Sequence, residues 1–182
     1  MLLKMKLTNP EVVFMVSYLM DAILLTKQAK ELGIKPKIFA GAAAGFALPD
    51  YPAGAGSAAE NVITADLWAD DVAYEGVKEF LAEFRKRYGM EPTYHASEGH
   101  ALVKVIVDAL ERTDSLEPAA ITAALKATNM STVFAPVRFQ DFLNYTNQNK
   151  VTTLVRQVQH GQLITIWPKS VANAEYVYPL PE

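Results

Sequence analysis

The chain has 182 residues, enough for one ordinary domain or two small ones. It is 51% hydrophobic and 20% charged, which is typical of a packed globular protein and excludes a disordered one. The formal net charge of −3 leaves no basic surplus for phosphates, so we expect no nucleic-acid partner. The sequence contains no cysteine and three histidines, which argues against disulfides, thiolate nucleophiles and zinc sites. We therefore predict no metal and no cofactor.

The apolar runs are too short to cross a membrane. The longest, Val12 to Val16 and Gly41 to Leu48, fall well short of the roughly 20 residues that a spanning helix needs. We expect no membrane insertion. Lys4 and Lys6 interrupt the first seven residues, which therefore differ from a signal peptide. If the chain is made as written, we expect it to stay in the cytoplasm.

The first forty residues predict a βαβ unit. A short helix over Met1 to Leu7 is ended by Asn9-Pro10. The continuous β-branched and aromatic run Glu11 to Val16 predicts a strand covered on both faces, as in a parallel sheet. A helix from Asp21 to Leu32 and a strand over Lys37 to Ala40 complete the unit, whose crossover we expect to be right-handed.

The middle of the chain predicts one more strand and then three helices. A loop of small residues, Gly41 to Phe46, and an irregular stretch, Pro49 to Gly56, precede a strand over Asn61 to Ala65. The second helix covers Ser97 to Arg112, and Pro118 lies in the first turn of the third. The expected inward faces of the three helices are Val77, Phe80, Leu81, Phe84 and Tyr88; Leu102, Val105, Ile106, Ala109 and Leu110; and Ile121, Ala124 and Leu125.

The last quarter of the chain predicts extended structure. Val133 to Phe139 is extended, and Asn144 to Asn149 is a polar loop. Val151 to Gln159 and Leu163 to Trp167 alternate with period two around a tight turn, which predicts an antiparallel hairpin. Three parallel strands with one covering helix make a poor free-standing sheet. The order of elements therefore indicates a piece of a larger α/β architecture.

Several segments carry a resemblance beyond their predicted structure. They are Asn9 to Phe14 with Tyr18, Gln28 to Gly33, Ser57 to Ile63, Phe84 to Pro92 followed by Tyr94 and Ala96, Thr132 to Phe139, and Gln159 to Gln162. In this order they resemble the C-terminal half of type I periplasmic binding proteins, the substrate-binding proteins of leucine/isoleucine/valine-type ABC importers. The resemblance implies an α/β chain with a partial type I fold: a parallel βαβ unit, a three-helix segment and a C-terminal antiparallel hairpin.

The resemblance also implies a function and partners. A full-length relative is periplasmic, binds a small molecule in the cleft between two lobes without catalysis, and delivers it to an ABC permease. The expected ligand is an amino acid or an aliphatic or aromatic carboxylate. Residues 1–66 would belong to the second lobe, 67–130 would be helices that pack on the first lobe, and 131–182 would return to the second lobe. Because the first lobe is missing, we expect a homo-oligomer, or a rearrangement of the helices, to hide their apolar faces.

The resemblance places ligand contacts at two strand ends. Tyr18 follows one strand at the carboxyl edge, where open α/β sheets bind ligands, and the matching tyrosine faces the ligand in the family. Ala43, Ala44 and Phe46 follow the next strand. Amino-acid-binding members carry an acidic residue near here that receives the ligand's ammonium group, so the alanines favour a less polar ligand. A packed aromatic residue at position 18 and a plain flexible loop are the alternatives.

Two further contacts are expected from the helical part of the chain. Tyr94 matches an aromatic residue that lines the family's cleft from the first lobe, and His95 stands beside it. Ser97 and Glu98 in the same turn are ordinary helix-capping and dipole-compensating residues.

The sequence contains no motif that would support catalysis. G-x-S-x-G, G-x-G-x-x-G and P-loop signatures are absent, and His95 and His100 are five residues apart, which does not place both on one helix face. We expect the aspartates at 66, 70 and 71 to form a solvated loop. We predict no catalytic residue.

Two other functions remain open. One is a small α/β enzyme with its site at the Gly41 to Phe46 loop, for which Asp21 is the only general base close to Tyr18 in sequence. The other is a ligand-sensing domain of a receptor or regulator, which shares the same fold.

Overall fold

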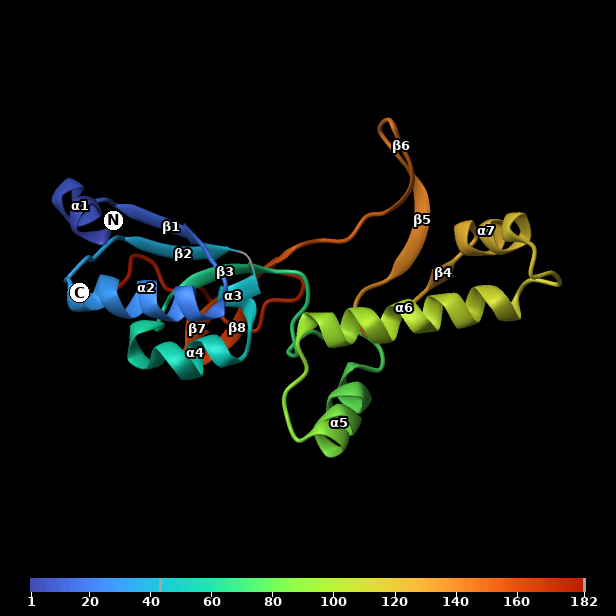
Figure 1. Cartoon of the computed structure of the whole chain (residues 1–182), viewed down its shortest axis with the longest axis horizontal. Coiled ribbons are helices and arrows are strands. Elements are labelled where there is room, and N and C mark those ends of the chain that lie inside the picture. The colour runs from blue at the N-terminus through green and yellow to red at the C-terminus, as the bar shows by residue number, and fades with distance from the viewer. Residues whose placement is uncertain (43, 182) are drawn as a thin grey trace. The chain divides into compact units, whose positions relative to one another are not determined.

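The structure is a computed structural model that describes residues 1–42 and 44–181 in two compact units (Figure 1). The first unit comprises residues 1–71 and 153–182, and the second comprises residues 72–152. The first contains α1 (Leu2–Thr8), β1 (Val12–Val16), α2 (Leu19–Glu31), β2 (Ile38–Ala42), α3 (Ala44–Ala47), α4 (Asp50–Ala55), the 3₁₀ turn η1 (Gly56–Ala58), β3 (Ile63–Asp66), β7 (Leu154–Gln159) and β8 (Gln162–Trp167). The second contains α5 (Val77–Tyr88), α6 (Tyr94–Glu111), α7 (Pro118–Lys126), β4 (Asn129–Met130), β5 (Val137–Phe142) and β6 (Tyr145–Asn149).

The first unit is built on a five-stranded mixed sheet in the order β1-β2-β3-β7-β8. β1, β2 and β3 are parallel neighbours, whereas β7 is antiparallel to β3 and to β8. The turn between β7 and β8 has positive φ at both central residues, 55° at His160 and 76° at Gly161, as a tight two-residue hairpin requires. The predicted α/β class, with its parallel βαβ unit and C-terminal hairpin, is confirmed.

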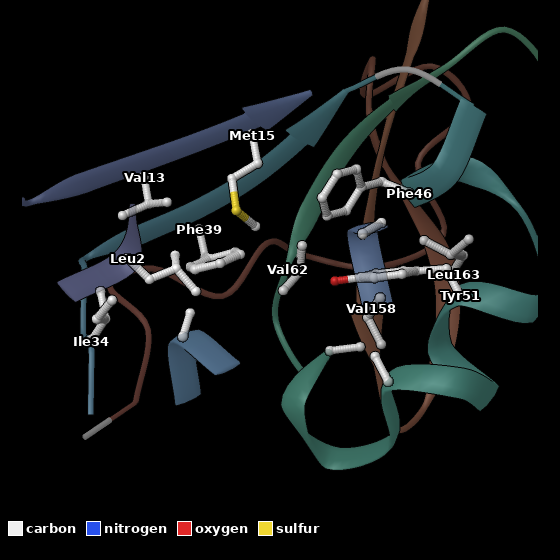
Figure 2. Close-up of a cluster of buried hydrophobic side chains, with 14 residues drawn as sticks. Leu2, Val13, Met15, Ile34, Phe39, Phe46, Tyr51, Val62, Val158 and Leu163 are labelled. Carbon is white, nitrogen blue, oxygen red and sulfur yellow. The ribbon is translucent and has the colours of Figure 1, made fainter. Parts of the chain in front are cut away.

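One face of this sheet carries the hydrophobic core. Val13 and Met15 of β1 and Phe39 of β2 point to the same side, toward the helices (Figure 2). Leu2 of α1 joins this cluster, as do buried residues of α2 and α4. Tyr51 of α4 is fully buried, and its hydroxyl lies 2.9 Å from Thr26 of α2. Burial raises the pKa of Tyr51 to about 12, so its hydroxyl stays protonated in the core.

The opposite face of β1 is exposed within the described residues. Val12, Phe14 and Val16 are 55%, 64% and 65% exposed, although they alternate with the buried Val13 and Met15. The expectation of a strand covered on both faces is therefore wrong. The reason is that the helices packed on β1 within the described residues contribute to the cluster on the Val13 side.

The second unit contains the three predicted helices, and the packed face of α6 was predicted only in part, because Val105 and Ala109 are buried as expected. Its buried residues are Ser97, Ala101, Val105 and Ala109, at a spacing of four. Leu102, Ile106 and Leu110 were expected inside and are instead 58%, 44% and 39% exposed. The smaller side chains face the neighbouring elements, and the larger ones face outward. Periodicity identified the helix but not which of its two apolar faces would be packed.

Two segments with weak hydrophobic patterns form regular structure. Residues 144–149, expected as a polar loop, contain β6, which pairs antiparallel with β5. Residues 49–56, expected as irregular, contain α4. The strands β5 and β6 belong to the second compact unit, whereas the expected division grouped residues 131–182 with the second lobe.

Gly45 and Gly54 offer a matched test of how tightly the first unit is packed. A Cβ atom at Gly45 would overlap the backbone of Ser17, Tyr18 and Leu19, which cannot rotate away. We expect Gly45→Ala to lower the free energy of unfolding by about 2 kcal/mol in urea titrations. At Gly54 the new methyl group would meet only the movable end of the Ile23 side chain.

Gly54→Ala should change that free energy by less than about 1 kcal/mol, because Ala favours the helix while Ile23 adjusts. Equal losses for the two variants would show that the α3 turn is not packed against the end of β1 as described.

Candidate functional site

The carboxyl ends of β1 and β2 meet at one edge of the sheet. The Ser17 N–H donates to the Ala42 carbonyl at 3.4 Å, and the Gly45 N–H donates to the Ser17 carbonyl at 3.3 Å. These two bonds join the segment that follows β1 to the segment that follows β2. Tyr18 and Ala44, two of the predicted contacts, are thereby brought to the same edge. The Tyr18 side chain is 77% exposed there.

The other two predicted residues of this edge differ in their placement. Phe46 is fully buried, and its ring lies against Tyr51 with centroids 5.0 Å apart. It also occupies the space that a side chain at residue 41 would fill, which explains the glycine there. Phe46 is thus a core residue, and its role toward a ligand stays a prediction. Ala43 lies outside the described residues.

The start of α2 adds an electrostatic feature to the same edge. Tyr18 is the N-cap of this 13-residue helix and makes no side-chain capping bond. The first N–H groups of a helix have no intrahelical acceptor and carry partial positive charge, which favours a nearby anion. Asp21 in the first turn is the only acidic residue there, and it is exposed.

Ser17 lies at the same edge but was not among the residues predicted from the sequence to line the site. Its Oγ atom is buried and has no hydrogen-bond partner among the described residues, although such an atom costs about 1–3 kcal/mol. The only signal was its position between a strand and Tyr18.

Tyr94 and His95 begin α6 in the second unit. Their rings stack with centroids 3.9 Å apart and an interplanar angle of 28°. Tyr94 is half-buried and His95 is exposed. These two residues and the Tyr18 edge therefore belong to different units of the chain, and their roles toward a ligand stay predictions.

The second unit also contains a cavity of about 640 Å³ between α5 and α6. Phe80 and Phe84 of α5 and His100 of α6 line it, and the Phe80 ring lies 5.2 Å from the His100 ring. Burial, with a smaller contribution from Lys104, lowers the pKa of His100. His100, and not His95, is therefore the histidine associated with this cavity.

A buried ion pair lies at the carboxyl end of β3. Arg156 Nη1 donates to Asp66 Oδ2 at 3.3 Å, and Nη2 donates to Asp70 Oδ1 at 2.8 Å and to the Leu163 carbonyl at 2.7 Å. Asp66 is 4% exposed and Arg156 is 5% exposed. Burial raises the pKa of Asp66 to about 6, although Arg156 and the N–H groups of residues 67 and 68 oppose the shift.

The expected solvated aspartate loop is therefore wrong for two of the three residues. Asp71 accepts bonds from the Thr165 N–H at 2.8 Å and from the Thr165 hydroxyl at 2.6 Å. The Asn173 amide donates to the Asp71 carbonyl at 2.9 Å. Only Asp70 keeps a substantially exposed side chain, at 44%. The sequence did not predict these buried interactions, because Arg156 and Thr165 lie about 90 residues beyond the aspartates along the chain.

Within residues 1–42 and 44–181, no helix has both the length and the hydropathy that a membrane span needs.

Comparison with known proteins gives a consistent result. The family model described as periplasmic binding protein matches residues 1–162. The chain belongs to the periplasmic binding protein family. A curated relative, Leu/Ile/Val-binding protein homolog 7 of Brucella suis biovar 1 (strain 1330), is 28% identical over 185 residues, covering 98% of this chain and 46% of that protein.

Solved periplasmic binding proteins show the same fold. The leucine-binding protein of Thermotoga maritima MSB8 superposes with a TM-score of 0.73 at 20% identity, covering 90% of this chain and 46% of that one. A solute-binding protein of an ABC transporter from R. palustris, solved with benzoate, superposes with a TM-score of 0.73 at 17% identity. The match covers 97% of this chain and 47% of that one. The chain therefore spans about half the length of the binding proteins that it matches. The resemblance found in the sequence is confirmed.

The buried pair in this binding-protein chain predicts a pH-dependent loss of stability. Arg156→Met leaves Asp66 without its charged partner, so we expect about 3–5 kcal/mol less stability at pH 7.5. Losing Arg156 also raises the pKa of Asp66 further above about 6. Below that pKa the carboxyl group is neutral and costs less to bury, so the loss should shrink at pH 5.

The measurement is urea unfolding of both proteins at pH 5 and pH 7.5. Lys37→Met, which breaks an exposed pair with Glu11, is the control and should leave stability nearly unchanged at both values. A loss for Arg156→Met that is the same at both pH values would exclude Asp66 as its cause.

Proposed function

We propose that this chain is part of the substrate-binding component of an ABC uptake system and binds a small carboxylate without catalysis. The observation that carries the proposal is the family match over residues 1–162. Relatives named as Leu/Ile/Val-binding proteins support a role in uptake of small carboxylates. The permease of such a system would be the partner of the whole protein.

The ligand site that we propose in the first unit is the edge formed by Tyr18, Ala42, Ala44 and the start of α2. The exposed Tyr18 ring offers a surface for the apolar part of a ligand. The uncapped start of α2 favours a carboxylate. The residues described after β2 provide small side chains, so a ligand can approach the backbone closely.

We further propose that the ligand has no ammonium group. The described residues at the end of β2 carry no carboxylate that would pair with one, and an unpaired charge is costly to desolvate. An aliphatic or aromatic carboxylate fits this edge better than an amino acid does. The benzoate bound by the R. palustris protein shows that the fold accommodates such a ligand.

Binding by this chain alone should be weak. In a two-lobed binding protein the closed state is favoured by contacts that the ligand makes with both lobes. This chain spans about half the length of the binding proteins that it matches, so we expect it to supply only part of those contacts. The alternative of a ligand-sensing domain uses the same site and differs in its partner rather than in its ligand chemistry.

A titration followed by amide NMR shifts tests the proposal. We expect 4-methylpentanoate and benzoate to shift the amides of Tyr18, Leu19 and Ala44 with dissociation constants in the roughly millimolar range. Leucine, which is 4-methylpentanoate with an added ammonium group, should bind at least about tenfold more weakly. Tyr18→Ala should abolish the shifts.

Tyr176→Ala is the matched control, because Tyr176 is a 61% exposed tyrosine of the same unit outside the proposed site. It should leave the titration unchanged. Tighter binding of leucine than of 4-methylpentanoate would contradict the ligand class. Nanomolar binding by the chain as a monomer would contradict the proposal that this chain supplies only part of the ligand contacts.

A further inference from the structure

A pocket of about 820 Å³ lies in the first unit at the amino ends of β2 and β3. The end of α2 with its connection to β2, residues 57–62 before β3, and residues 179–181 line it. Because all of these residues belong to the first unit, the geometry of the pocket is internal to that unit. The edge that holds Tyr18 and Ala44 lies at the carboxyl ends of β1 and β2, at the other end of the parallel strands.

The floor of this pocket is apolar. Ile34, Phe39 and Val62 line it and belong to the hydrophobic core of the first unit (Figure 2). Leu180 also lines the pocket and packs against the same core. An apolar group that enters the pocket would therefore lie against core side chains and be removed from water.

Hydrogen bonds hold the wall that residues 179–181 form. The Leu180 N–H donates to the Lys37 carbonyl at 3.0 Å. Nearby along the chain, the Val177 N–H donates to Gln157 Oε1 at 2.8 Å, and Gln157 Nε2 donates to the Val177 carbonyl at 3.0 Å. Gln157 is itself fully buried in β7. The pocket is therefore bounded by packed segments, which lowers the entropy cost of binding a ligand there.

The described lining of the pocket carries a surplus of positive charge. It includes Lys30, Lys35 and Lys37, whereas its one acidic side chain is Glu60. The Glu60 carboxylate accepts bonds from two backbone N–H groups of the β7–β8 turn, at 2.8 and 3.1 Å, which partly balance its charge. A chain with a net charge of −3 thus gathers positive charge at this pocket, which favours an anion.

Lys35 is the lysine that is available to a ligand. Lys30 Nζ donates to the Ser57 carbonyl at 2.7 Å, and Lys37 pairs with the exposed Glu11. Lys35 is exposed, and its Nζ has no hydrogen-bond or ion-pair partner within residues 1–42 and 44–181. It can therefore turn toward an anion without giving up another bond.

The carboxyl end of α2 also lies at the pocket and carries partial negative charge. Two of its last carbonyl groups are occupied, because that of Lys30 accepts the Gly33 N–H at 2.9 Å and that of Ala29 accepts the Ile34 N–H at 3.0 Å. Lys30 in the last turn offsets the partial charge further. The end of the helix therefore does not cancel the charge of the lysines.

We propose that this pocket is a second ligand site, independent of the proposed ligand edge, and that it binds an amphiphilic anion of the class of medium-chain fatty acids. The apolar chain would lie against Phe39 and Leu180, and the carboxylate would meet Lys35 at the rim. The volume is within the roughly 300–1,000 Å³ of pockets that bind small molecules. A small inorganic anion would leave the apolar floor in water, and a cationic chain would be repelled by the lysines.

An amide NMR titration of the chain tests the proposal with decanoate as the probe. We expect decanoate to shift the amides of Lys35, Phe39 and Leu180 with a dissociation constant of roughly 0.1–1 mM. Decyltrimethylammonium, which has the same chain and the opposite charge, should bind at least about tenfold more weakly. Tyr18→Ala, which alters only the proposed ligand edge, should leave the shifts of Lys35 unchanged, so either site can fail without the other.

A charge reversal tests the role of Lys35. Lys35→Glu should weaken decanoate binding about fivefold or more, because it replaces an attraction to the carboxylate by a repulsion. Its circular dichroism should stay unchanged, since the side chain is exposed. Lys169→Glu is the matched control, because Lys169 is an exposed lysine of the same unit outside the pocket, and it should bind decanoate as the wild type does.

Four results would overturn the proposal. They are the absence of any shift up to about 10 mM decanoate, shifts confined to Tyr18 and Ala44, equal binding of the cationic probe, and unchanged binding by Lys35→Glu.

Discussion

The pairing of β3 with β7 is the interaction on which the first unit depends. It joins residues 63–66 to residues 154–157, so the sheet is complete only after the chain has passed through the second unit and returned. Arg156 strengthens the junction by binding Asp66 of β3, Asp70 just beyond it and the Leu163 carbonyl of β8. Such a long-range contact must repay the entropy of closing a long loop. A buried and multiply bonded guanidinium group at the junction makes breaking the pair costly.

The same junction helps to hold the sheet edge at which we propose that the ligand binds. β2 lies between β1 and β3, so the strand that carries Ala42 is fixed on one side by β1 and on the other by the strand that Arg156 holds. The α3 turn, residues 44–47, is packed as well. Its glycine at position 45 fits against the backbone after β1, and Phe46 is sealed in the core. The described residues of the proposed site therefore belong to packed elements, which favours a preorganised surface over one that must order on binding.

The elements that could be predicted from sequence are those with a local signal. Continuous β-branched residues indicated β1, apolar residues three and four positions apart indicated α6, and the His160-Gly161 dipeptide indicated the last hairpin. The burial of each face could not be predicted, because it depends on what packs there. Val12 and Val13 are chemically identical neighbours, and only their side of the sheet decides that one is exposed and the other buried. For the same reason the burial of Phe46 could not be predicted from its place after a strand, and Asp66 was expected to be solvated from its acidic neighbours.

The charge at the proposed ligand site comes from backbone N–H groups as much as from side chains. The start of α2 contributes partial positive charge without a capping side chain, and the described residues after β2 contribute no negative charge. Asp21 offsets the helix end only in part, because it is exposed and screened by water. An ammonium group would meet the positive end of a helix here, whereas a carboxylate would be stabilised by it. Beside an exposed tyrosine ring, that arrangement supports our proposal of a ligand that is apolar at one end and anionic at the other.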